Sequence, residues 1–317
     1  MVHRRDLIVL VLLSGPLLAQ SDSALFQDPR VQRILRLESK GRHQAACEAY
    51  DELAADTAFR SLALRQKGTC LALHQGRPVE AMASYDAAIA WAPRDPANYV
   101  ERAMFNQEMN MPGNAVTDMR MAISLATDPR QRSIYLSDLA SAYAHMRRWK
   151  EGLDVLDTAR ALDSTDIGVL VNRSLALDEL GRHREALAEL LRADSLYPRD
   201  ALIYNNLGYH YTRRDDHQGS LIWYRRAVEV QPDSPYALNN LGYAELRAGD
   251  REAALRLVQR SIEIDPGNSY AYRNLGHVWK EKGDLAKACE AYERALQLGF
   301  GMRYGPEVKQ MKDTYCR

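Results

Sequence analysis

Four asparagines recur at a constant interval in the second half of this 317-residue chain. They are Asn172, Asn206, Asn240 and Asn274. Two of them lie in identical copies of the pentapeptide NNLGY. A side-chain amide offers both a donor and an acceptor, so such an array can pair with the backbone of a bound chain whatever its sequence. The alternative is that these asparagines simply occupy a solvated helix surface.

Tyrosine and arginine, two residue types enriched at binding hot spots, lie close to these asparagines in the sequence. The candidates are Tyr209, Tyr243, Arg213, Arg247 and Arg273. Stretches nearer the N-terminus carry acidic residues instead, namely Glu101, Glu108, Asp138, Asp178 and Glu179. A groove lined by these side chains would be acidic toward its N-terminal end and mixed or basic toward its C-terminal end. Solvated helix faces carry similar charges, so the polarity alone does not establish a site.

Catalytic and metal-binding patterns are not found in the sequence. His210 and His217 lie near Asp215 and Asp216, but such a cluster is more typical of a solvated helix end than of a metal site. There is no glycine-rich loop before a helix, no zinc-type cysteine spacing and no nucleophile elbow. We therefore expect no enzyme, no bound metal and no cofactor.

The composition argues against two further classes of protein. With 46% apolar residues the chain can bury a large core, which argues against extensive disorder. Lys and Arg total 42, as do Asp and Glu, so no excess of positive charge favours nucleic acid. We expect a protein or peptide partner.

The spacing of small residues indicates the elements that position these candidates. Gly208, Gly242 and Gly276 are each followed, twelve residues later, by a second small residue. These second residues are Ser220, Ala254 and Ala288. Small residues at two fixed points let antiparallel helices approach closely, and prolines after the second helix end it. A single helical hairpin cannot bury its apolar face, so neighbouring hairpins are expected to stack.

This pattern resembles the tetratricopeptide repeat, a helical hairpin of 34 residues. The best match, SYAYRNLGHVWKEKGDLAKACEAYERALQLGF, begins at Ser269. The resemblance implies an all-α, right-handed α-solenoid of about eight hairpins with a C-terminal capping helix. The expected repeats are 27–61 (degenerate), 62–95, 96–132 (with a short insertion), 133–166, 167–200, 201–234, 235–268 and 269–302, followed by the capping helix at 303–317.

The same resemblance implies a place for the candidate residues. In this family the first helix of each hairpin lines a concave face that usually binds extended peptides, and some long arrays hold chains by an asparagine ladder. The asparagines, tyrosines and arginines above would then line a peptide-binding groove. Some relatives clamp a C-terminal carboxylate with lysine and asparagine at set positions. Asn239 and Arg273 break that pattern, so the clamp is not carried over.

The four cysteines allow three disulfide connectivities. Stacked hairpins advance by on the order of 10 Å per helix layer, so Cys70 and Cys289 are expected far beyond the Cα separation of about 7 Å that a disulfide can span. The pairs that remain are local, Cys47 with Cys70 and Cys289 with Cys316. Buried free thiols are the alternative, and an oxidising compartment favours the disulfides.

The N-terminus has the features of an export signal. Arg4 and Arg5 precede the uncharged stretch LIVLVLLSGPLLA, and Ala19 precedes a polar region. The apolar stretch is shorter than the roughly 20 residues of a membrane-spanning helix. Residues 1–19 are therefore expected to be a bacterial signal peptide, with an uncleaved anchor as the alternative. No later stretch is expected to span a membrane, and the mature protein is expected to be periplasmic or secreted.

Together these features predict a non-catalytic scaffold of the cell envelope whose groove binds a peptide or protein segment. The alternative is a structural or self-associating subunit of an envelope assembly. The sequence leaves the partner and the oligomeric state open.

Overall fold

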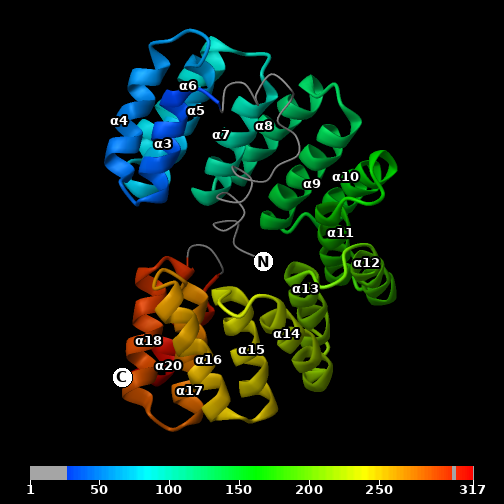
Figure 1. Ribbon diagram of the computed structural model, residues 1–317. Coiled ribbons are helices and arrows are strands. Elements are labelled where there is room, and N and C mark those ends of the chain that lie inside the picture. The colour runs from blue at the N-terminus through cyan, green and yellow to red at the C-terminus, as the bar shows by residue number, and fades with distance from the viewer. Residues whose placement is uncertain (1–26, 302–304, 317) are drawn as a thin grey trace. The chain divides into compact units, whose positions relative to one another are not determined.

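The computed structural model describes residues 27–301 and 305–316, which form 17 helices and no strand (Figure 1). The expected signal peptide at residues 1–19 lies outside the described residues. The helices are α3 (Pro29–Ser39), α4 (His43–Ala54), α5 (Arg60–His74), α6 (Pro78–Trp91), α7 (Pro96–Glu108), α8 (Pro112–Leu125), α9 (Pro129–His145), α10 (Trp149–Leu162), α11 (Ile167–Glu179), α12 (His183–Leu196), α13 (Ala201–Thr212), α14 (His217–Val230), α15 (Pro235–Ala248), α16 (Arg251–Ile264), α17 (Ser269–Glu281), α18 (Leu285–Gln297) and α20 (Glu307–Tyr315).

Many of these helices begin after a short polar side chain that accepts a hydrogen bond from a backbone amide of the first turn. The capping residues are Asp28, Asp95, Asp128, Asp200, Asp216, Ser234, Asp250, Asn268 and Asp284. Each satisfies a backbone donor that has no partner within the helix, which typically stabilises a helix by about 1 kcal/mol. The polar residues between apolar segments therefore determine where these helices start.

Consecutive helices pack in pairs at the small residues. Gly208 on α13 lies against Tyr224 on α14, so closely that a methyl group added to Gly208 would lie 2.6 Å from the ring. The Tyr224 side chain is buried, and its hydroxyl lies 3.4 Å from Thr212 Oγ1. In the next pair, Gly242 on α15 meets Val258 on α16 in the same way. The small residues thus allow the close approach of the two helices in each of these hairpins.

The described residues divide into two compact units, one up to residue 172 and one from residue 173 onward. They are described separately here as the N-terminal unit and the C-terminal unit, and their boundary falls within α11. In the N-terminal unit α5 contacts α7 and α7 contacts α9, and in the C-terminal unit α13 contacts α15 and α15 contacts α17. Within each unit's described residues, no two second helices make comparable contacts. The first helices therefore lie on the inner side, and we call the surface that they form the inner face of each unit.

The C-terminal unit ends in the short helix α20, which packs on α18. Val308 of α20 and Phe300 are buried in a cluster with Tyr292. The helix thereby covers apolar side chains of the last full hairpin, as expected of a capping helix. Among the described residues, no helix combines the length and the apolar character that crossing a membrane requires.

Candidate functional site

The asparagine ladder lies on the first helices, but its amides mainly bond to neighbouring first helices. Asn274 Nδ2 on α17 donates to Asn239 Oδ1 on α15 at 2.9 Å, and Asn240 Nδ2 donates to Asn205 Oδ1 on α13 at 3.2 Å. In the N-terminal unit, Asn172 Nδ2 donates to Ser137 Oγ on α9 at 2.9 Å. Each donor is paired with the side chain 35 residues earlier in the chain. These amides stabilise the stacking of successive hairpins.

Asn206 is the exception to this pattern. Asn206 Nδ2 instead donates to Leu202 O of its own helix, at 2.8 Å. The first asparagine of each NNLGY copy, Asn205 or Asn239, is buried and supplies the acceptor for the next repeat. The repeated pentapeptide thus encodes both halves of a contact between hairpins.

The candidate arginines also contact the adjoining first helix or the loop after it. Arg213, which follows α13, forms an ion pair with Glu179 of α11 at 3.1 Å. Arg247 of α15 forms one with Asp215 at 3.1 Å, in the loop after α13. Both guanidinium groups remain partly exposed. They can therefore contact a ligand only together with the carboxylates that already accompany them.

The candidate tyrosines lie at the same position of α13 and α15 and are half-buried. Burial raises the pKa of Tyr209, although Arg213 beside it acts in the opposite direction. The Arg273 guanidinium lies over the ring of Tyr243, 5.3 Å from its centroid. The inner face of the C-terminal unit therefore presents amphipathic rings flanked by arginines.

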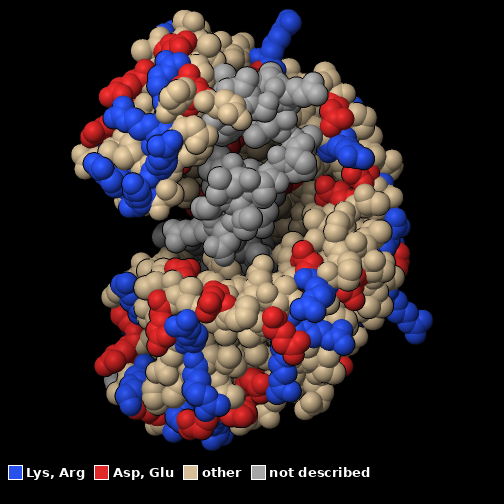
Figure 2. Space-filling model, in the orientation of Figure 1, with Lys and Arg blue, Asp and Glu red and all other residues tan. Residues whose placement is uncertain are grey.

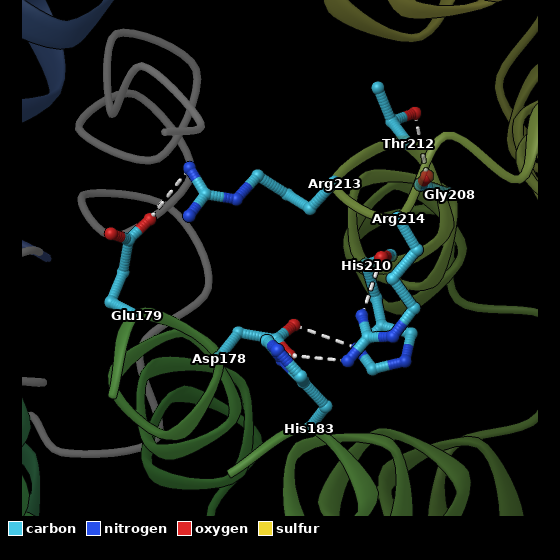
Figure 3. A network of polar contacts seen from close by, with 8 residues as sticks. All are labelled: Asp178, Glu179, His183, Gly208, His210, Thr212, Arg213 and Arg214. Carbon is cyan, nitrogen blue, oxygen red and sulfur yellow. Dashed lines mark hydrogen bonds and ion pairs between the residues drawn. The ribbon is translucent and has the colours of Figure 1, made fainter. Parts of the chain in front are cut away.

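A polar network centred on the buried Asp178 and His210 joins α11, α12 and α13 within the C-terminal unit (Figure 3). Asp178 of α11 lies 2.7 Å from His210 Nδ1, 3.0 Å from His183 Nδ1 and 3.2 Å from Arg214 NH2. Burial alone would raise the pKa of Asp178, but the hydrogen bonds from His210, His183 and Arg214 outweigh it and leave the pKa below its ordinary value. The network fixes α13 against the end of α11.

This network corrects two expectations. His210 does not belong to a solvated helix end, because its side chain is only 3% exposed and bonded to Asp178. Asp178 in turn does not line an acidic groove, because it is 4% exposed and neutralised by basic partners. His217, at the start of α14, is separate from this cluster. The described residues contain no group of three or more His, Cys, Asp or Glu arranged to hold a metal ion.

Two first helices of the N-terminal unit carry acidic residues at the position that asparagine occupies in α11, α13, α15 and α17. Glu101 on α7 lies 3.5 Å from Thr69 Oγ1 on α5, and burial raises its pKa. Asp138 on α9 is buried. Asp138, like Asp178, lies among side chains of the fold, whereas Glu101 is half-buried and lines a hollow together with Glu108. On the visible face of the C-terminal unit, basic and acidic side chains are interspersed (Figure 2).

Both local cysteine pairs are disulfides in the structure. Cys47 of α4 is bonded to Cys70 of α5, with Cα atoms 5.7 Å apart. Cys289 of α18 is bonded to Cys316, directly after α20, with Cα atoms 5.6 Å apart. Disulfides of this structural kind are typical of proteins in oxidising compartments. They indicate an exported environment for this chain.

Sequence reasoning missed the partners of the inner-face residues. Asn205 was not among the candidates, and Asn239 and His210 were considered only for other roles, yet each bonds a side chain of a neighbouring first helix. Glu307, which pairs with Arg273, was missed as well. A search for polar residues that complement each other at intervals of 34 or 35 residues would have found the asparagine pairs and Glu307.

Comparison with known proteins agrees with this architecture. Three family models described as tetratricopeptide repeat match the chain, at residues 199–266, at residues 32–98 and 239–299, and at residues 167–200. Together they cover more than half of it, and the chain therefore belongs to the tetratricopeptide repeat family. The comparison with curated proteins finds no match.

Several solved structures have a similar fold. A tetratricopeptide repeat protein of Parabacteroides merdae has a TM-score of 0.61 at 15% identity, with 81% of this chain and 99% of that chain covered. Yeast Tom70 has a TM-score of 0.67 at 14% identity, with 97% and 77% covered. A thermophilic repeat protein of Thermus thermophilus has a TM-score of 0.53 at 15% identity, with 58% and 98% covered. At these identities the likeness shows the fold alone, and it confirms the predicted α-solenoid of tetratricopeptide hairpins.

Proteins with this repeat fold are generally non-catalytic scaffolds that bind protein partners. The fold, rather than any reactive group, thus defines the class of this chain.

Proposed function

We propose that the protein is a non-catalytic scaffold of the bacterial cell envelope, and that the inner face of its C-terminal unit binds an extended segment of a partner protein. The observation that carries this proposal is the repeated presentation of a half-buried tyrosine, Tyr209 or Tyr243, with a partly exposed arginine four residues later. Tyrosine and arginine supply large contact areas together with hydrogen bonds and are enriched at hot spots. The two disulfides and the export-type N-terminus support the location.

The asparagine ladder has a different part in this proposal from the one that the sequence predicts. Its Nδ2 groups are bonded between helices or, at Asn206, within one helix. Among the described residues, no donor to Asn240 Oδ1 is found, so this acceptor can receive a hydrogen bond from a bound backbone. We therefore expect the ladder to set the spacing of the inner face, with the tyrosines contributing most of the contact area.

The test is crosslinked capture from envelope extract with the mature chain and with a Tyr209→Ala, Tyr243→Ala variant. A matched control is Tyr197→Ala, which removes a partly exposed tyrosine at the C-terminal end of α12. We expect a partner that the native chain and the control retain and that the double variant loses while keeping its helical content. Equal capture by all three would favour the alternative, a structural subunit that associates through other surfaces.

A further inference from the structure

Helix α17 carries three basic side chains on the face that α20 covers. Arg273, His277 and Lys280 follow one another at intervals of four and three residues, so they lie along one side of the helix. The Arg273 guanidinium forms two hydrogen bonds to Glu307, from Nε at 3.1 Å and from NH2 at 2.8 Å. His277 Nε2 lies 3.4 Å from the same carboxylate, and Lys280 Nζ lies 5.3 Å from the Tyr315 ring centroid.

These three side chains form what we call the basic cradle, and two of them, Arg273 and His277, bind the Glu307 carboxylate strongly. The hydrogen bond from His277 and that from Arg273 lower the pKa of Glu307 to about 2, although burial acts in the opposite direction. Burial would lower the pKa of Arg273, but its hydrogen bond to Glu307 raises it overall. A two-pronged contact between a guanidinium and a carboxylate is among the stronger hydrogen-bonded arrangements in proteins and is geometrically selective.

An apolar pocket adjoins this cradle. Val308, the residue after Glu307, is fully buried and is the buried residue of α20. It belongs to a cluster with Phe300, Tyr292 and Ala288, and the partly buried rings of Tyr270, Tyr272 and Trp279 pack against that cluster. The surface beneath α20 therefore accepts a carboxylate followed directly by an aliphatic side chain.

Helix α20, which covers this surface, has little stability of its own. It has nine residues, no side-chain N-cap and one buried side chain, whereas helices shorter than about 12–15 residues are marginal on their own. Its other contacts are the packing of Met311 against the same cluster and an ion pair between Lys312 and Glu293 of α18. Its far end is tied by the disulfide between Cys316 and Cys289. A short covalent tether supplies an effective concentration in the millimolar range, so this bond adds to the tether that the chain between α18 and α20 already provides.

We propose that α20 is an internal ligand of the inner face, and that the site which it fills binds an acidic–aliphatic segment of a partner protein in competition with α20. The occupant is assigned by charge and shape: a carboxylate for Arg273 and His277, and an aliphatic side chain for the aromatic pocket. The inference extends the proposed function, because it names the chemistry of a segment bound at the end of the same face. Tyr243 adjoins this site through Arg273, but the test below measures binding of the α20 peptide and not capture of a partner, so the two proposals can fail separately.

The direct test uses an open variant of the full chain, in which Val308→Asp, Cys289→Ser and Cys316→Ser together prevent α20 from docking. The ligand is a synthetic peptide with the sequence of residues 305–315, GPEVKQMKDTY, and its binding is followed by ligand-observed NMR up to about 1 mM, the range of a tethered ligand. We expect binding to the open variant and at least tenfold weaker binding to the intact chain. The Glu307→Gln peptide, and the open variant that also carries Arg273→Gln, should each lose tenfold or more.

Equal binding of the native peptide to the intact and open chains would overturn the proposal. So would a folded open variant that binds neither the native peptide nor the Glu307→Gln peptide, or that binds the two with equal affinity. If the open variant loses its helical structure, the proposal is tested instead with the Cys289→Ser, Cys316→Ser variant, in which α20 is otherwise unchanged. The measurement is amide hydrogen exchange. We expect its α20 amides to exchange more than tenfold faster than in the native chain while α17 stays protected. Unchanged protection of α20 would show that it is a permanent part of the fold.

Discussion

At the scale of single residues, identical side chains have different uses because their neighbours differ. Asn274 is buried, donates to Asn239 and accepts from Arg273 NH1 at 2.8 Å. Asn206 is half-buried and bonds only a backbone carbonyl of its own helix among the described residues. The loss of a buried partner leaves another polar group unsatisfied, which costs more than the loss of an exposed one. The two asparagines should therefore respond differently to the same substitution.

We expect Asn274→Ala to lower the free energy of unfolding by about 1–3 kcal/mol, because Asn239 Oδ1 is left without its donor. Asn206→Ala, the matched control, should cost less than about 1 kcal/mol. Urea denaturation followed by circular dichroism measures both. Equal losses would mean that the contact between the two asparagines does not stabilise the stacking of α15 and α17.

A second prediction concerns the close approach of α13 and α14. Gly208→Ala would place a methyl group against the Tyr224 ring, and overpacking of this kind typically costs about 1–3 kcal/mol. Gly113→Ala is the control, since nothing lies within 4 Å of a methyl group added there and alanine favours a helix over glycine. Thermal unfolding should show a lower Tm for the first variant and an equal or higher Tm for the second.

At the scale of elements, α20 illustrates a helix that depends on its contacts. Its own propensity does not suffice at nine residues, so docking depends on its contacts. These are the Glu307 ion pair, the packing of Val308 and Met311, the Lys312–Glu293 ion pair and the Cys289–Cys316 bond. The Glu307 contact makes the docking sensitive to pH. Its carboxylate has a lower pKa in the folded chain than in the unfolded one, so the folded state binds fewer protons.

Lowering the pH weakens the contribution of Glu307 to stability. The stability that Glu307 contributes is fully present above its unfolded pKa near 4.5 and is lost as the pH falls toward about 2. We expect Glu307→Gln to reduce stability at pH 7 and to differ less and less from the native chain as the pH is lowered through this window. Chemical denaturation at several pH values measures the difference, and a gap that stays constant with pH would contradict the contribution of the Glu307 carboxylate.

At the scale of the whole molecule, a repeat array distributes stability among neighbours. Each hairpin contacts mainly the next one, so a local weakness is expected to remain local. The two disulfides lie near the ends of the described chain, joining α4 to α5 and α18 to the residue after α20. Ends have one neighbour fewer and open most readily, so covalent links there have the largest effect on fraying.

We therefore expect the Cys47→Ser, Cys70→Ser variant to exchange its α3, α4 and α5 amides faster than the native chain. A disulfide that closes a loop of this length typically stabilises by about 3 kcal/mol. Amides of α13 to α17 serve as the internal control and should keep their protection. Faster exchange throughout the chain would show that the array unfolds as one cooperative unit.

Much of the fold could be predicted because its determinants are local and repeated. The glycine pairs, the polar caps and the prolines act within one hairpin, and each repeat shows them again, so the period alone indicated helical hairpins. The disulfides could be paired for a related reason, since each joins helices that are close in the sequence and lie within one unit. The polar contacts could not be predicted in the same way. In the sequence, Asn239 and Asp178 look like ordinary surface residues, because their partners lie on a neighbouring helix.

The sequence by itself determined the hairpins, their repetition and the family, because backbone propensity and side-chain size act over a few residues. Only the tertiary structure decided which polar groups stay available on the inner face. Stacking brings Asn274 to Asn239, His210 to Asp178 and Glu307 to Arg273. Each of these contacts joins residues more than 30 positions apart, and a buried polar group must find a partner wherever packing supplies one.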